Sequence, residues 1–360
     1  MTSRHNTPKL VGSWQFEELK PQLGVEHESV RRFRDDRLDL TVFIAVHNSN
    51  RGSALGGARI RAYRDETAAL ADVLKLSEGM TYKNVLAGLP FGGAKACLVE
   101  KPWDEDTRRL ALRRFGEFVE SFGGRYTTAE DMGSSVADIM VVREVTKHVC
   151  CLAGGIGDPS PWTARGVLAG IEAALVRSDG SPSVAGKIFA IEGIGKVGHH
   201  LALELYERGG SLVLADIVEE RLGAWKGSPR VSIVDPTEIR GVSSDVYCPC
   251  AAGQSLTPEV IANLKARIVV GGANNQLAEP DGARRLARRG VLYCPDFVVN
   301  AGGVIAAAAE LHGWNTDELC RRIGGIGECL GRLLDKAAAT GAEDIQALAV
   351  REARAMVGLG

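Results

Sequence analysis

The sequence predicts an α/β protein of two domains, the second of which is a doubly wound parallel sheet. Its 360 residues exceed what one hydrophobic core usually holds, so two domains are expected. In the C-terminal half, apolar runs with strand character alternate with helical stretches, a pattern typical of parallel sheets with crossover helices. A glycine-rich fingerprint follows the first of these runs, where such a sheet binds phosphate groups.

The overall composition is that of a globular protein with balanced charge. Hydrophobic residues make up 45% of the chain, charged residues 24%, and the formal net charge is −2. A charge so close to zero argues against nucleic acid and against a membrane surface as partners. The N-terminal segment 1–10 lacks the apolar core of a secretory signal, and the longest nearly apolar run, 298–309, is too short to cross a bilayer. We therefore expect a cytoplasmic protein.

The eight cysteines are scattered without the paired C-x-x-C spacing of a zinc site. Cys248 and Cys250 form the only close non-adjacent pair, and a ligand role for them is the weaker interpretation. We expect free thiols in a reducing cytosol and no metal site.

The first 150 residues predict an α/β domain of their own. Apolar residues recur at helical spacing in Glu66–Gly79 and Thr107–Phe122. The glycine- and proline-containing segment Gly154–Pro161 is the expected hinge to the second domain. Expected strands are 40–48, 59–64, 96–100 and 125–131.

Residues 151–340 predict the doubly wound domain. Helices are expected at Val197–Arg208 and Pro258–Leu264, between strand-like runs. A final helix is expected at Glu343–Val357, and we leave open whether 341–360 returns to pack on the first domain. The expected strands are 187–193, 211–217, 231–235, 245–250, 267–273 and 291–297.

The fingerprint G-x-G-x-x-G lies between a predicted strand and a predicted helix. Its glycines would form a tight turn, let backbone approach a pyrophosphate and let helix pack on strand, as in a Rossmann domain. Alone, the pattern also fits a structural turn. Asp216, at the end of the next strand, favours the binding interpretation and favours NAD over NADP, because a carboxylate accepts ribose hydroxyls and repels a 2′-phosphate. The predicted cofactor residues here are Gly193, Ile194, Gly195, Lys196, Val197, Gly198 and Asp216.

A second group of motifs lies in the first domain. Lys83 and Lys95 occur in apolar, glycine-bearing surroundings, where a merely solvated lysine is unusual. Asp131 ends a strand-like segment and supplies a carboxylate. Such groups suit acid/base chemistry, but surface ion pairs explain the three residues equally well. The motifs are LGGAR (55–59), MTYKN (80–84), FGGAK (91–95) and AEDMG (129–133).

Over most of its length the chain resembles the glutamate/leucine/phenylalanine/valine dehydrogenase family. This resemblance implies a homo-oligomer, assembled through the N-terminal domain, and two domains that close on a cleft, the first binding substrate and the second NAD. The reaction it implies is oxidative deamination of an L-amino acid to a 2-oxo acid and ammonia. The segments that carry it, in the family's order, are LGGARI, EGMTYKN, GLPFGGAK, GGRYTTAEDMG, GDPSPWTARGV, GIGKVGHHL, GGANNQL and PDFVVNAGGVI.

The resemblance also implies roles for individual residues. Lys83 would bind the substrate α-carboxylate with help from the backbone of Gly56–Gly57. Lys95, at the end of a glycine-rich loop, would activate the water that attacks the iminium ion left by hydride transfer, and Asp131 would move protons to and from the amino group. Asn275 would position substrate and nicotinamide, and Thr163 would contact the cofactor. The sequence departs from the family in GGAK, usually GGGK, and in CPCAAGQ, where leucine-type members tend toward APCALGG.

The side-chain pocket implied by the resemblance is apolar. Glutamate-specific members carry a lysine at the position of Leu55 and a serine at that of Ala307, so glutamate would find no partner for its carboxylate. A leucine, valine or isoleucine substrate is expected, with a phenylalanine-type substrate as the alternative. A shikimate-type dehydrogenase and a non-catalytic NAD-binding relative are the rival interpretations. The residues expected to line the pocket are Leu55, Met80, Ala129, Val304 and Ala307.

Overall fold

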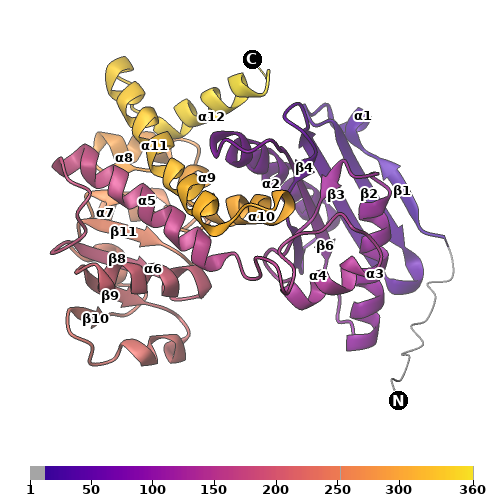
Figure 1. Cartoon of the computed structure of the whole chain (residues 1–360), viewed down its shortest axis with the longest axis horizontal. Helices are drawn as coiled ribbons and strands as arrows, with labels where there is room; N and C mark the ends of the chain where they lie inside the picture. Colours follow the sequence, from indigo (N-terminus) through magenta and orange to yellow (C-terminus); the bar gives the residue numbers. More distant parts are fainter. Residues whose placement is uncertain (1–12, 252, 360) are drawn as a thin grey trace. The chain divides into compact units, whose positions relative to one another are not determined.

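The structure is a computed structural model that describes residues 13–251 and 253–359, and it separates into two compact units (Figure 1). Unit 1 contains the described residues up to Thr81 together with Pro90–Gly157. Unit 2 contains Tyr82–Leu89 and the described residues from Asp158 onward. The division lies inside the expected hinge segment, after residue 157 instead of 150. It also transfers residues 82–89 to the second unit.

Unit 1 is built on a mixed sheet whose strands follow the order β1-β2-β3-β6-β4-β7, with β5 paired to β6. The first four strands are antiparallel neighbours, whereas β4 and β5 run parallel to β6. Apolar and β-branched residues predominate in β3, whereas its neighbour β6 consists mainly of small and apolar residues around Lys95. The strands are β1 (Gln15–Glu18), β2 (Ser29–Asp35), β3 (Leu40–Asn48), β4 (Ala54–Leu55), β5 (Ala58–Arg61), β6 (Gly92–Val99) and β7 (Tyr126–Thr127).

Two helices of unit 1, α3 and α4, begin at side-chain caps. Asp104 accepts a hydrogen bond from the backbone N–H of Thr107 at the start of α3, and Ser135 forms a capping box at α4. The α3 helix buries Phe115 and Phe118 in the core of the unit. The helix expected at 66–79 is longer than predicted and continues through the MTYKN motif. The helices are α1 (Lys20–Leu23), α2 (Glu66–Leu86), α3 (Glu105–Glu120) and α4 (Val136–Arg143).

Unit 2 confirms the doubly wound sheet. Its six described strands are all parallel and follow the order β10-β9-β8-β11-β12-β13, which is the 3-2-1-4-5-6 arrangement of dinucleotide-binding sheets. Strands are added toward one edge of the sheet from β8 to β10 and toward the other edge from β11 to β13. The strand order therefore reverses between β8 and β11, and folds of this kind bind ligands at that point. The strands are β8 (Ile188–Glu192), β9 (Ser211–Ala215), β10 (Val231–Ile233), β11 (Val246–Pro249), β12 (Ile268–Val269) and β13 (Leu292–Tyr293).

Helices flank this sheet, and α5 packs alongside α6, α10 and α11 (Figure 1). The C-terminal α12 packs on α8 and α11, so residues 345–356 belong to unit 2. No helix in the described part of the chain is long and apolar enough to span a bilayer. The helices are α5 (Ser160–Asp179), α6 (Lys196–Glu207), α7 (Pro258–Asn263), α8 (Gly282–Arg288), α9 (Asp296–Val299), α10 (Gly302–His312), α11 (Thr316–Thr340) and α12 (Ile345–Met356).

Candidate active site

The glycine-rich segment before Lys95 is a strand and not the expected loop, because β6 begins at Gly92. Both glycines are required by close backbone neighbours. A Cβ on Gly92 would lie 2.0 Å from the carbonyl oxygen of Asn48, and one on Gly93 would lie 2.1 Å from the backbone nitrogen of Thr81. Ala94 packs in the core of unit 1, so the strand accommodates GGAK in place of GGGK.

The strand delivers Lys95 to Asp131. The Nζ atom of Lys95 lies 3.1 Å from Oδ1 of Asp131, and both side chains are largely buried. Ser134 fixes the turn that carries the carboxylate, because its Oγ accepts from the backbone N–H of Asp131 and donates to the carbonyl of Ala58. The structure therefore brings the two residues predicted to be catalytic into direct contact.

Arg59, which the sequence did not single out, binds the other oxygen of the same carboxylate. Its Nε donates to Oδ2 of Asp131 at 3.0 Å, while its Nη1 lies 3.0 Å from Oδ2 of Asp72 on α2. Tyr63 donates from its hydroxyl to the same Asp72 carboxylate at 2.8 Å. Asp131 thus lies between two cations, and one of them is tied to a second acid.

These contacts decide the charge of Asp131. Burial alone would raise the pKa of its carboxyl, but the charges of Lys95 and Arg59 and their hydrogen bonds outweigh burial and lower the pKa to about 2. Asp131 is therefore ionised at neutral pH. Burial also opposes the charge of Arg59, but the carboxylates of Asp131 and Asp72 outweigh it and hold the pKa of the guanidinium above its usual range.

Gly56 and Gly57 lie against the same elements. A Cβ on Gly56 would be 1.7 Å from the carbonyl oxygen of Ala94, and one on Gly57 would be 2.6 Å from that of Glu130. The hydroxyl of Tyr126 also donates to the carbonyl of Gly56. Only glycine lets this backbone run so close to the Lys95 and Asp131 segments.

Lys83 belongs to unit 2, where its ammonium group is held by an asparagine. Its Nζ donates to Oδ1 of Asn274 at 3.0 Å, and Asn300 donates to the same oxygen at 2.8 Å. Neither asparagine was a predicted site residue. The GGANNQL motif therefore contacts Lys83 through its first asparagine.

Asn275, the predicted residue of that motif, has a left-handed backbone with φ of 52°. Its backbone N–H donates to Oδ2 of Asp296 at 2.8 Å. Burial raises the pKa of Asp296, although this hydrogen bond and the charge of Lys83 oppose the rise. Asp296 thus fixes the strained turn from which Asn274 and Asn275 project.

The five predicted pocket residues are divided between the units. In unit 1, Leu55 and Ala129 are buried and Met80 is partly exposed on α2. In unit 2, α10 carries the buried Ala307 and the partly exposed Val304. No charged residue occurs among the five.

Thr163 lies in the first turn of α5. Its hydroxyl donates to the carbonyl of Pro159 at 3.1 Å and faces the start of α10, since a Cβ on Gly303 would lie 2.6 Å from Oγ1.

The fingerprint has the geometry that a phosphate site requires. Gly193 has a φ of 94°, and a Cβ on Gly198 would lie 1.9 Å from the carbonyl oxygen of Gly193. Gly195, at the N-cap of α6, has no side-chain cap, and a Cβ there would meet nothing within 4 Å. The first and third glycines therefore serve backbone shape and packing, while the middle one faces open space at a positive helix end.

The other fingerprint residues have their own partners. Ile194 is buried and donates its backbone N–H to Oδ2 of Asp216 at 2.6 Å, while Val218 donates to Oδ1 at 2.8 Å. Arg221 lies 3.4 Å from the same carboxylate. A carboxylate can accept about four hydrogen bonds, and Arg221 donates to both oxygens at 3.4 Å, so ribose hydroxyls would bind here by replacing the long contacts of Arg221. Lys196 pairs with Asp158 at 3.1 Å, and Val197 packs against Gly272.

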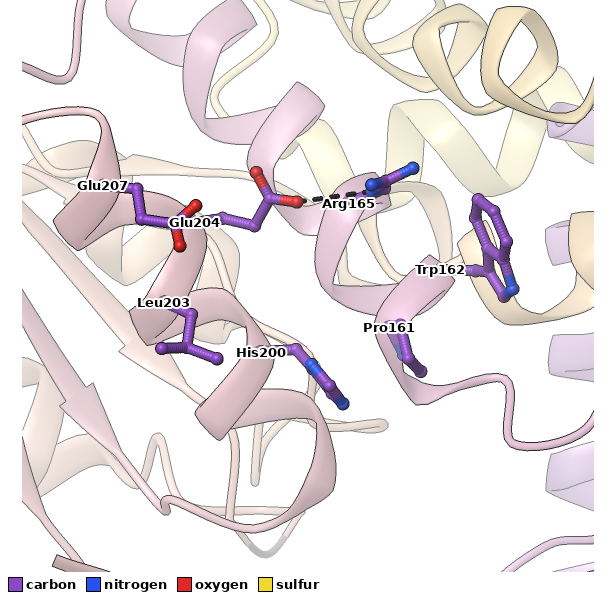
Figure 2. Close-up of a pocket in the computed structure, with 7 residues that line it drawn as sticks. All are labelled: Pro161, Trp162, Arg165, His200, Leu203, Glu204 and Glu207. Carbon is purple, nitrogen blue, oxygen red and sulfur yellow. Dashed lines mark hydrogen bonds and ion pairs between the residues drawn. The ribbon is translucent and has the colours of Figure 1, made fainter. Parts of the chain in front are cut away.

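A separate cavity of about 260 Å³ lies between α5 and α6 (Figure 2). Two of its charged residues form an ion pair, Arg165 with Glu204 at 3.3 Å, and the guanidinium of Arg165 stacks over the ring of Trp162. Within the described residues no cluster of three or more potential ligands could hold a metal ion. The lining residues are Pro161, Trp162, Arg165, His200, Leu203, Glu204 and Glu207.

Two family models match the chain. The one described as Glu/Leu/Phe/Val dehydrogenase, dimerisation domain, matches residues 27–148, and the one described as Glutamate/Leucine/Phenylalanine/Valine dehydrogenase matches residues 213–320.

Individual proteins are similar to this chain over most of their length. A leucine dehydrogenase of Geobacillus stearothermophilus is 40% identical, covering 83% of this chain and 82% of its own. A valine dehydrogenase of Streptomyces virginiae is 44% identical, covering 81% and 83%. The crystal structure of an L-tryptophan dehydrogenase from Nostoc punctiforme superimposes with a TM-score of 0.80 at 32% identity, covering 94% of this chain and 98% of that one.

Proposed function

This chain belongs to the glutamate/leucine/phenylalanine/valine dehydrogenase family and oxidatively deaminates an apolar L-amino acid to its 2-oxo acid, and we propose that Lys95 and Asp131 perform the proton transfers of this reaction with NAD as the oxidant. The observation that carries this assignment is the contact of 3.1 Å between the ammonium group of Lys95 and the carboxylate of Asp131. A buried amine beside an ionised carboxylate can exchange a proton without solvent.

The proposed roles follow from charge. Lys83 offers an ammonium group, oriented by Asn274, to the substrate α-carboxylate. Asp131 accepts a proton from the substrate amino group, and Lys95 takes the proton of the water that attacks the iminium carbon. Asp131 then protonates the amino group of the resulting carbinolamine, the C–N bond breaks to release ammonia, and the freed carboxylate of Asp131 takes up the hydroxyl proton as the C=O bond of the 2-oxo acid forms. Backbone groups of Gly56 and Gly57 assist in binding the carboxylate.

NAD, when bound, accepts the hydride from the substrate Cα. The residues of the fingerprint fit such a group, since Gly195 leaves the N-terminus of α6 open and Asp216 ends β9 beside it. We assign Asp216 to the adenosine ribose, with NAD preferred over NADP. Thr163 and Asn275 are assigned to the nicotinamide side, and Asn275 also to the substrate.

The pocket assignment supports a leucine-, valine- or isoleucine-type substrate. Neither Leu55 nor Ala307 can pair with a side-chain carboxylate, and burying glutamate without a partner costs several kcal/mol. Met80, Ala129 and Val304 complete the apolar lining. An aromatic substrate is the second candidate, favoured by the small side chain of Ala307 and by the similarity to a tryptophan dehydrogenase.

We further propose a homo-oligomer in the cytoplasm. The family model described as a dimerisation domain covers residues 27–148, which supports assembly through unit 1. All eight cysteines are free thiols, as expected in a reducing compartment.

The test is a panel of L-amino acids with the purified chain and either NAD or NADP. Reduction of the nicotinamide is followed by absorbance, and ammonia and the 2-oxo acid are measured as products. Equal amounts of reduced NAD and ammonia are expected from leucine, valine and isoleucine, and none from glutamate. Turnover of glutamate comparable to that of leucine would contradict the pocket assignment, and comparable efficiency with NADP would contradict the cofactor assignment.

A further inference from the structure

We propose that Arg59 is a positioning residue for catalysis, which occupies one oxygen of Asp131 permanently and leaves the other oxygen to exchange protons with Lys95. This inference rests on the proposed function, because it assumes that Asp131 is the proton carrier. It adds Arg59, which was not among the predicted site residues and whose side chain binds Asp131 and Asp72.

The geometry divides the carboxylate between two cations. Arg59 donates from Nε to Oδ2 of Asp131 at 3.0 Å, while Nζ of Lys95 faces Oδ1 at 3.1 Å. Arg59 lies on β5 and Lys95 on the neighbouring, parallel β6, so the sheet fixes both donors. A guanidinium bound at Oδ2 stops the carboxylate from rotating, and the lone pairs of Oδ1 keep one orientation.

The two cations differ in what they can release. Lys95 must give up and regain a proton during the reaction, so its charge is absent at one stage. An arginine in a protein does not deprotonate, so Arg59 keeps its charge throughout. If Lys95 were the only cation, Asp131 would become a buried carboxylate without a counter-charge at that stage and would take up a proton itself. Arg59 holds the pKa of Asp131 low while Lys95 is neutral, so that Asp131 gives up again the proton that it accepts from the substrate.

A second acid holds Arg59 in place. Asp72 on α2 accepts from Nη1 of Arg59 at 3.0 Å and from the hydroxyl of Tyr63 at 2.8 Å. The guanidinium is therefore held by two carboxylates, that of Asp131 at the proposed catalytic site and that of Asp72 on α2. Among the described residues, the charged groups that face Asp131 are Lys95 from β6 and Arg59 from β5, and Asp72 reaches the site only through Arg59.

A purely structural role is the alternative, because a buried arginine between two acids also stabilises a fold. The two roles differ in the pH dependence of activity. Removing the charge of Arg59 takes away one of the two cations that lower the pKa of Asp131. The carboxylate then protonates at a higher pH, and activity is lost on the acid side. We call the acidic part of the pH profile of kcat/KM, over which activity falls, the acid limb. A structural role alone would lower the amount of folded enzyme without moving the acid limb.

The experiment uses Arg59→Lys and Arg59→Met in the full chain, with kcat and kcat/KM measured against pH. Arg59→Met should lower kcat about 10- to 100-fold, with little change in KM, and should move the acid limb of kcat/KM upward by at least about one pH unit. Arg59→Lys restores a positive charge but lacks the planar guanidinium that binds both acids. It should return the acid limb toward that of the wild type and leave kcat reduced.

Arg114→Lys and Arg114→Met are matched controls, since Arg114 is a buried arginine paired with Asp35 and Glu117 elsewhere in unit 1. Their acid limbs should equal that of the wild type.

Asp72→Asn is a second variant with the opposite electrostatic sign. It removes a negative charge near the site, so Asp131 stays ionised and the acid limb does not rise. The kcat should nevertheless fall, because the guanidinium loses one of its anchors. Wild-type kcat in Asp72→Asn, or an unmoved acid limb in folded Arg59→Met, would overturn the proposal. Asp131→Asn, measured in parallel, separates the two assignments: an active Asp131→Asn refutes the proposed function, whereas an inactive one beside unchanged Arg59 variants refutes only the role of Arg59.

Discussion

Lys95 and Asp131 lie 3.1 Å apart, Nζ to Oδ1, although one belongs to the central strand β6 and the other to the turn after β7. Two features of the chain produce this contact. Glycines at the start of β6 allow the strand to pass close to its neighbours, and Gly57 allows the Glu130–Asp131 segment to approach. The positions of these glycines in the sequence thus allow the side chains of Lys95 and Asp131 to come into contact.

Lys95→Ala should abolish turnover and leave NADH binding nearly unchanged. The variant removes the proposed acid/base group, which contributes about 10²- to 10⁴-fold in rate, whereas the fingerprint lies in unit 2. Steady-state kinetics and NADH fluorescence titration measure the two effects. Lys101→Ala is the matched control, because Lys101 is a more exposed lysine of unit 1 paired with Asp39. A Lys95→Ala enzyme within tenfold of wild-type turnover would show that another group moves the protons.

Asp131 should make the folded state less stable in acid. Its pKa is about 2 when folded and about 3.9 in an unfolded chain. A group with a lowered folded pKa stabilises the protein above the unfolded value, and this contribution is lost as the pH falls from about 4 toward 2. The stabilisation at neutral pH amounts to about 2 to 3 kcal/mol.

The free energy of unfolding of the wild type and of Asp131→Asn, measured between pH 7 and about 2, checks this value. Asp131→Asn should be less stable at neutral pH, and the difference should shrink in acid. A constant difference across that range would mean that the carboxylate does not titrate as its contacts require.

Asp216→Ser should reduce the preference for NAD over NADP. The serine removes the repulsion of a 2′-phosphate, and Arg221, 3.4 Å from the original carboxylate, supplies a cation for it. Relative kcat/KM for the two cofactors should change by at least about tenfold, or 1.4 kcal/mol. Asp216→Ser together with Arg221→Ala should lose the gain with NADP. Wild-type enzyme that uses both cofactors equally would contradict the role of Asp216.

Ala307→Val should shift preference from bulky side chains toward valine and leucine. Two added methyl groups on the buried face of α10 reduce the space for an aromatic ring, and the ratio of kcat/KM for leucine over phenylalanine should rise roughly tenfold. Leu311→Val, on an exposed position of the same helix, should not change this ratio. An unchanged ratio in Ala307→Val would place the substrate side chain elsewhere.

The sequence predicted the doubly wound sheet well because its signals are local. The fingerprint and the alternation of strands with helices depend on short segments, and β8, α6 and β9 lie where these segments indicated. The α5 helix was not predicted, since Pro161 in the GDPSPW segment resembled a hinge, whereas it occupies the first turn of a helix. The strand character of Gly92–Lys95 was missed because glycine disfavours strands unless another backbone comes close.

The partners of the predicted site residues could not be predicted. Arg59 lies within a quoted motif, but only the fold shows that it reaches both Asp72 and Asp131. A buried arginine needs acidic partners, yet the sequence offers 45 acidic residues and does not rank them. In the same way, the contact of Lys83 with Asn274, and not Asn275, depends on the left-handed turn at Asn275 that Asp296 fixes.

The hydrogen bond from the backbone of Ile194 to Asp216 ties the shape of the glycine turn to the side chain that we propose for cofactor choice. A replacement of Asp216 that admits a 2′-phosphate by deleting the acceptor also leaves an N–H group within the glycine turn without its partner. A single replacement of this kind, in evolution or in design, therefore also disturbs the glycine turn at Gly193–Gly198. The accessible routes begin with Asp216→Asn, which removes the charge but keeps an acceptor for Ile194, and only then recruit further basic residues beside Arg221.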